Sequence, residues 1–121
     1  MTNFEIMKDF INSLDEDEEI KSLQEEYELS ENDNSKLTKG LIEKSLYFDE
    51  KGKILTLEEW KEIYIETAIM VTSYDYDIST GKKRPRPKNF VSKYINQSIE
   101  KLGMDSEDIY DTYDDGNTFT K

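Results

Sequence analysis

The chain contains no cysteine and no histidine among its 121 residues. Without cysteine there is neither a disulfide framework nor a thiolate metal site. Without histidine the chain lacks the side chain that most often ligates transition metals or moves protons near neutral pH. Phosphate-loop, nucleophile-elbow and zinc-ligand motifs are also missing, and carboxylate pairs among 28 acidic residues carry no information. We therefore predict a protein that is not an enzyme and that uses no cofactor and no metal.

Long apolar runs are absent as well. No stretch approaches the roughly 18 consecutive apolar residues of a membrane span, and the first 20 residues carry acids throughout rather than a secretion signal. This predicts a soluble, cytoplasmic protein. Alanine, glycine, proline and arginine together fill only 10 of 121 positions. This scarcity favours an AT-rich coding sequence, such as that of a low-GC bacterium or its phages, in which case the cytoplasm is that of the host.

Apolar spacing predicts a mainly α fold. Leucine, isoleucine, valine and phenylalanine total 28 residues, enough for one core, and the length indicates a single domain over residues 1–121. Apolar residues three and four positions apart predict about five helices. These lie over residues 4–14, from residue 14 onward, around residues 37–42, over residues 57–71 and over residues 89–102, with Gly103 as the residue that follows the last helix. We predict a small helical bundle with one or two short β-hairpins, in which helix 57–71 is central.

Local signals set the expected ends of these helices. Ser13 with Glu16 and Thr56 with Glu59 have the spacing of capping boxes, in which two side chains satisfy the first amides of a helix. Asn3 or Thr2 can cap the first helix. Residues 30–35 are polar without apolar periodicity and are predicted to form a loop.

Two glycine-containing segments predict the hairpins. In the first, apolar flanks surround residues 49–52, where Gly52 can supply a positive φ. In the second, residues 74–78 alternate aromatic and acidic side chains before Gly81 and a basic segment. A three-residue turn there would place Asp77 opposite Lys83, Tyr76 opposite Arg84 and Tyr74 opposite Arg86.

Residues 47–58 have glycine at the sixth position, isoleucine at the eighth and glutamate at the twelfth, between two expected helices. This segment resembles the calcium-binding loop of an EF-hand, which implies oxygen ligands at Asp49 and Glu58. Tyr47 stands where the first carboxylate belongs, and Lys51 places an ammonium group at another ligand position. We therefore favour a structural turn, with a calcium site as the alternative.

The net charge of −12 is unevenly distributed. Residues 1–34 carry 12 acids and two lysines, a net of −10, and residues 103–121 carry six acids and one lysine, a net of −5. Residues 35–102 carry 10 acids and 13 cations, a net of +3. The domain is thus expected to have a near-neutral core between an acidic N-terminal helical region and an acidic tail.

Two charged segments are the candidate binding sites. The first is an acidic helical face that would bind a partner with a basic surface, and the alternative is a merely solvated helix face. It comprises Asp15, Glu16, Asp17, Glu18, Glu19, Glu25 and Glu26. The second is a basic arm that holds both arginines and both prolines, and the alternative is a loop neutralised by the chain's own acids. It comprises Lys82, Lys83, Arg84, Arg86 and Lys88.

These features favour a small acidic protein that binds another macromolecule. The leading hypothesis is an inhibitor of a nucleic-acid-handling protein, of the phage anti-defence or DNA-mimic type, acting through protein–protein interaction. An immunity protein or antitoxin against a basic toxin is the first alternative, and a phage structural or assembly factor is the second. The net charge disfavours direct nucleic-acid binding except through residues 82–88.

Overall fold

The computed structural model describes residues 1–74, 76–77, 82–83 and 88–103. This part of the chain contains five α-helices, a 3₁₀ turn and two very short strands, so the predicted mainly α fold is confirmed. The elements are α1 (Asn3–Asn12), η1 (Leu14–Glu16), α2 (Glu18–Glu26), α3 (Glu31–Lys51), α4 (Leu57–Tyr74), β1 (Tyr76–Asp77), β2 (Lys82–Lys83) and α5 (Phe90–Lys101).

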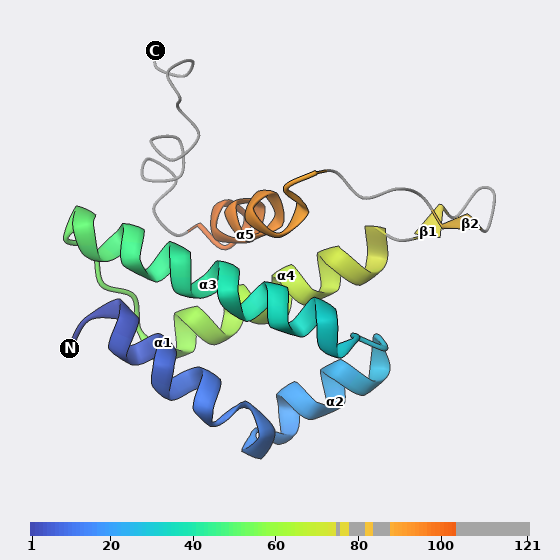
Figure 1. Ribbon diagram of the computed structural model, residues 1–121, viewed down its shortest axis with the longest axis horizontal. Helices are drawn as coiled ribbons and strands as arrows, with labels where there is room; N and C mark the ends of the chain where they lie inside the picture. Colours follow the sequence, from blue (N-terminus) through green and yellow to red (C-terminus); the bar gives the residue numbers. More distant parts are fainter. Residues whose placement is uncertain (75, 78–81, 84–87, 104–121) are drawn as a thin grey trace, which may run out of the picture.

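Helices α3 and α4 form the middle of the fold. Figure 1 shows α1 and α2 on one side of this pair and α5 on the other. Helix α4 packs against α1, α3 and α5, which confirms its predicted central place. Its fully buried side chains include Trp60, Ile63 and Tyr64. None of the helices in the described ranges combines the length and apolarity needed to span a membrane.

The start of α1 is fixed by local and distant hydrogen bonds. Thr2 and Glu5 form a capping box, with the Thr2 hydroxyl accepting from the Glu5 amide. The Asp49 carboxylate on α3 also accepts from the amides of Asn3 and Phe4, at 2.8 and 3.1 Å. A carboxylate at a helix N-terminus satisfies amides that have no partner within the helix. Helix α1 is therefore capped by a residue 46 positions away from Asn3.

The Asn3 side chain joins α1 to the segment between α3 and α4. Asn3 is fully buried, and its side-chain amide donates to the carbonyl oxygen of Lys53 at 2.5 Å. Its carbonyl oxygen accepts from the backbone amide of Leu55 at 2.8 Å and from the indole nitrogen of Trp60 at 3.4 Å. We call this set of contacts the Asn3 junction.

The predicted capping box at Ser13 is wrong. The Ser13 hydroxyl instead donates to carbonyl oxygens of the preceding turn, at Asp9 and Phe10. The chain then passes through η1, which buries Leu14, and α2 begins at Glu18, four residues beyond the start that a cap at Ser13 predicts. Asp17 is the true N-cap, because its carboxylate accepts from the amides at positions 19 and 20.

Helix α3 replaces two predicted irregular segments. The predicted loop over residues 30–35 is wrong, because the Ser30 hydroxyl accepts from the Asp33 amide and the helix begins at Glu31. The predicted hairpin around residues 49–52 is also wrong, because the helix continues to Lys51. Gly52 does have a positive φ of 73°, but as the residue that ends the helix. Left-handed glycine serves both purposes, so the sequence signal was ambiguous.

The continuation of α3 also removes the EF-hand resemblance. The first third of the supposed loop is helical, and Asp49 caps α1 instead of facing an ion. Among the described residues no group of three or more acidic side chains is arranged to hold a metal. Asp49 thus has a structural role at the start of α1, and we do not retain the calcium alternative.

Other sequence predictions can be compared directly with the structure. The Thr56–Glu59 capping box is confirmed by reciprocal hydrogen bonds of 2.8 and 3.1 Å. Strands β1 and β2 pair antiparallel, with Tyr76 opposite Lys83 and Asp77 opposite Lys82. The predicted register was therefore wrong by one residue, since four residues and not three connect the strands. That connection, its predicted arginine partners and the acidic tail beyond Gly103 lie outside the described residues.

Candidate binding surfaces

The predicted acidic face lies along η1 and α2, at the edge of the molecule where α1 and α2 meet (Figure 1). Six of its seven carboxylate side chains are exposed, and only Asp17 is half-buried. Helical geometry places residues seven apart on the same side. Glu18 with Glu25, and Glu19 with Glu26, therefore form two parallel rows. We call the seven residues the acidic surface: Asp15, Glu16, Asp17, Glu18, Glu19, Glu25 and Glu26.

Two members of the acidic surface already have a partner on α4. The Lys61 ammonium lies 3.0 Å from carboxylate oxygens of both Asp17 and Glu19. Partial burial acts to raise the pKa of Asp17, but the hydrogen bond from Lys61 and those from the Ile20 and Glu19 amides outweigh it, so the pKa lies below its ordinary 3.8. The hydrogen bonds to Glu19 and Asp17 raise the pKa of Lys61 above 10.5. Asp17 therefore acts structurally, fastening α2 to α4.

We expect Asp17→Ala to lower the free energy of unfolding by about 1 kcal/mol at neutral pH, because the α2 cap and one ion pair are lost. A carboxylate with a depressed folded-state pKa stabilises the fold above its unfolded pKa, and that contribution disappears as the pH falls through the folded pKa. The difference from the unsubstituted protein should accordingly shrink below pH 3.8. Urea unfolding at neutral pH and below pH 3.8 measures this difference in stability.

Asp17→Asn is the matched control, because asparagine is an equally good N-cap without the charge. It should lose less stability than Asp17→Ala at neutral pH. An equal loss in the two variants would show that the ion pair to Lys61, and not the cap, carries the contribution.

The basic arm is only partly described. Lys82 is exposed on β2, and Lys88 is exposed just before α5. Lys83 pairs through its backbone with Tyr76. Arg84 and Arg86 lie outside the described residues. The structure thus places Lys82 and Lys83 at one end of the arm and Lys88 at the other. Lys88 lines a cleft together with lysines of α3.

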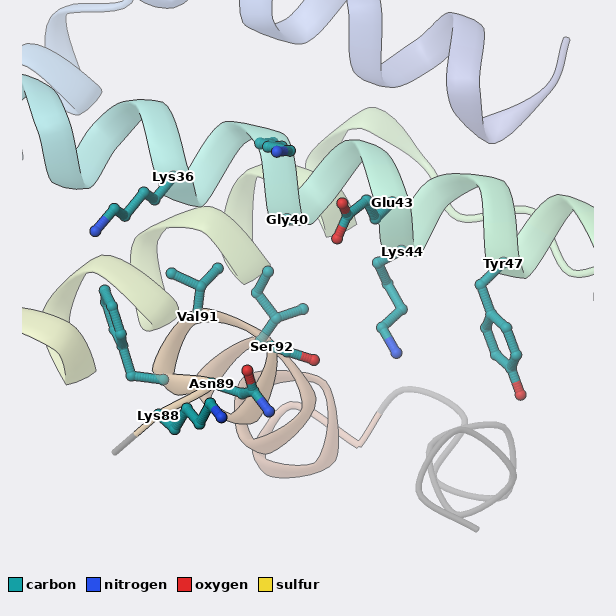
Figure 2. A pocket seen from close by; sticks show the side chains of 12 residues that line it. Lys36, Gly40, Glu43, Lys44, Tyr47, Lys88, Asn89, Val91 and Ser92 are labelled. Carbon is teal, nitrogen blue, oxygen red and sulfur yellow. The ribbon is translucent and has the colours of Figure 1, made fainter. Parts of the chain in front are cut away.

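The cleft has a volume of about 420 Å³ and lies between α3 and the start of α5. Figure 2 shows Lys36, Lys44 and Tyr47 extending from α3 toward α5, with Lys88 on the opposite side. Among the described residues, the lining of this cleft includes four lysines and one acid, Glu43. We call it the lysine cleft, and its lining residues are Lys36, Lys39, Gly40, Glu43, Lys44, Tyr47, Lys88, Asn89, Phe90, Val91, Ser92 and Ile95.

The lysines of the cleft differ in environment. Lys44 is only 7% exposed, and its ammonium lies 5.1 Å from the ring centre of Tyr47 and 5.8 Å from that of Phe48. Lys36 lies 5.8 Å from the ring centre of Phe90. Lys39 and Lys88 are exposed. Cation–π contacts of this kind hold an ammonium group beside an apolar surface. The cleft therefore combines positive charge with aromatic and aliphatic walls.

Sequence reasoning found only one lysine of this cleft. The signal that it missed is a stripe on α3, where positions 36, 39, 40, 43, 44 and 47 recur at helical spacing and all line the cleft. The predicted helix around residues 37–42 is too short to show this stripe, because residues 30–35 and the segment around residues 49–52 are predicted to be irregular. Helix α2, which carries part of the acidic surface, and α5, which lines the lysine cleft together with α3, lie on opposite sides of the α3–α4 pair (Figure 1).

Comparisons with known proteins leave the surfaces to be interpreted from their own chemistry. No protein-family model matches the chain. Searches of curated proteins and of solved structures likewise found no match.

Proposed function

We propose that this protein binds the basic surface of a protein partner through its acidic surface, and that the partner handles nucleic acid. The observation that supports the proposal is the concentration of charge: residues 15–31 carry nine acids and a single lysine. Only Asp17 and Glu19 in this segment are paired with Lys61. Exposed carboxylate rows attract a groove that evolved to bind phosphates, and the attraction accelerates association. The protein would inhibit by occupying that groove.

The test uses charge-neutral variants that leave the Lys61 contacts intact. Basic proteins recovered with the tagged chain from a nuclease-treated bacterial lysate are purified and titrated against it. The triple variant Glu16→Gln, Glu25→Gln and Glu26→Gln should bind about tenfold or more weakly, mainly through slower association. Double-stranded DNA should displace the purified partner from the unsubstituted chain.

The matched control removes the same number of charges elsewhere, with Glu43→Gln, Glu50→Gln and Glu100→Gln on α3 and α5. Its affinity should stay within about twofold of the unsubstituted chain, since screened charges far from a contact contribute little. Equal losses in the two triple variants, or a partner that DNA does not displace, would rule out the acidic-surface mechanism. A partner that is a toxin without a nucleic-acid groove would identify an immunity protein instead.

One observation favours a second candidate, an assembly factor. The acidic surface and the lysine cleft lie on opposite sides of the fold, so the acidic surface of one copy can face the lysine cleft of the next. Head-to-tail contacts of this kind build open chains. Light scattering at low and high salt distinguishes the two candidate functions. Only an assembly factor should form larger species that dissociate as the salt concentration increases.

A further inference from the structure

We infer that the lysine cleft is a binding site for a small organic phosphate of nucleotide size. This inference does not depend on the acidic surface, which lies on the other side of the fold. The cleft volume of about 420 Å³ falls within the range of small-molecule sites. A bare inorganic anion would occupy only part of such a space.

The charge of the lining selects an anion. Among the described residues of the lining, four lysines face one acid, Glu43, in a chain whose overall charge is −12. This excess of positive charge agrees with the net +3 of residues 35–102 and contrasts with the acidic N-terminal region. Lysine ammonium groups bind phosphate as point charges and need no fixed planar geometry, so several of them can share one phosphate chain.

Lys44 strengthens this assignment. Its side chain lines the cleft, although the residue is only 7% exposed. A charge removed from bulk water interacts with an opposite charge more strongly than an exposed one does. The rings of Tyr47 and Phe48 hold the ammonium in place, so little side-chain freedom remains to be lost when an anion binds.

The remaining walls select a ligand that is not purely ionic. Val91 and Ile95 approach Gly40 across the floor, and Phe90 and Tyr47 add aromatic rings. A phosphate alone would leave these groups in water, and an apolar ligand would leave the lysines unused. A molecule with a phosphate chain and a flat aromatic group satisfies both, because bases stack on aromatic side chains.

Isothermal titration of the full chain with ATP, AMP, inorganic pyrophosphate and adenosine tests the inference. ATP should bind, and pyrophosphate and adenosine should each bind about tenfold or more weakly, because each supplies only half of the matching chemistry. Lys39→Glu with Lys88→Glu should weaken ATP binding by a further factor of about ten or more. Both residues are exposed, so the fold should survive, as Trp60 fluorescence would report.

The matched control is Lys8→Glu with Lys21→Glu, which changes the net charge equally at two exposed residues of α1 and α2. ATP affinity should remain within about twofold, since neither residue lines the cleft and solvent screens exposed charges. Absence of ATP binding at millimolar concentration, or equal losses in the two double variants, would overturn the inference. Tighter binding of a short DNA strand than of ATP would also overturn it, in favour of a macromolecular ligand. Failure of ATP binding would leave the acidic-surface proposal intact.

Discussion

Asn3→Ala should lower the free energy of unfolding by about 3 kcal/mol. The substitution removes every side-chain contact of the Asn3 junction at once. The Leu55 amide and the Trp60 indole then lose their acceptor, and the Lys53 carbonyl loses its donor. Each buried polar group left without a partner costs about 1–3 kcal/mol. Since small domains are stable by only about 5–15 kcal/mol, this loss is a large share of the total.

Urea unfolding followed by fluorescence measures the effect, because Trp60 is the chain's single tryptophan and is itself part of the junction. Circular dichroism of the helices provides a second, independent probe. Asn12→Ala is the matched control, as this exposed asparagine ends the same helix and should cost less than about 0.5 kcal/mol. If Asn3→Ala and Asn12→Ala had equal effects, the junction would contribute nothing to stability.

Gly40→Ala should destabilise the protein by about 1–3 kcal/mol, although alanine is the better helix former by about 1 kcal/mol. A Cβ atom at this position would lie 2.6 Å from Cγ1 of Val91 and 2.9 Å from Cδ1 of Ile95. The first of these contacts is the harder to relieve, because a β-branched side chain has few allowed rotamers. The added methyl group would therefore push α5 away from α3.

A double-mutant cycle with Val91→Ala tests this explanation directly. In the Val91→Ala background the closest contact is gone, and the flexible end of Ile95 can move. Gly40→Ala should then be neutral or stabilising, since the gain in helix propensity remains. Urea unfolding of the four proteins gives the coupling energy. Stabilisation by Gly40→Ala in the unsubstituted background would show that α5 does not need the close approach.

Helices with strong local signals could be predicted from the sequence, and α4 is the best example. Its capping box at Thr56 and Glu59 and its apolar face around Trp60 and Ile63 act within one element, so neighbouring residues suffice to recognise it. Helix α5 was recognisable for the same reason, and Gly103, with a φ of 76°, follows its end as predicted.

Helix α3 could not be predicted to its full length, because its ends rely on interactions that also fit other structures. Its first turn is polar and is held by the Ser30 cap, and its last residues contain an Asp-Glu-Lys-Gly run typical of a turn. Asp49 in that run caps α1, which no local pattern reveals. Glycine is unfavourable inside a helix, yet Gly40 is the residue that lets α5 approach.

The two candidate sites differ in the same way. The acidic surface lies within one short stretch, residues 15–26, so its position on η1 and α2 followed once a helix was expected there, although the structural role of Asp17 did not. The lysine cleft joins residues 36–47 to residues 88–95, and only packing brings them together. A charge count could show that the middle of the chain is positive, but not where that charge gathers.

The Asn3 junction also sets the order in which the nascent chain can fold. Its hydrogen bonds link Asn3 to residues 50, 52 and 57 positions later. Helix α1, made before the other described helices, therefore cannot be secured by this junction until Trp60 has been synthesised, roughly 3–12 s after Asn3 at ordinary translation rates. Its apolar face packs on α3, which is complete only at Lys51, and an isolated helix of 10 residues is too short to persist in water. Helix α1, although made before α3 and α4, is fixed in place only after the middle of the described chain has emerged.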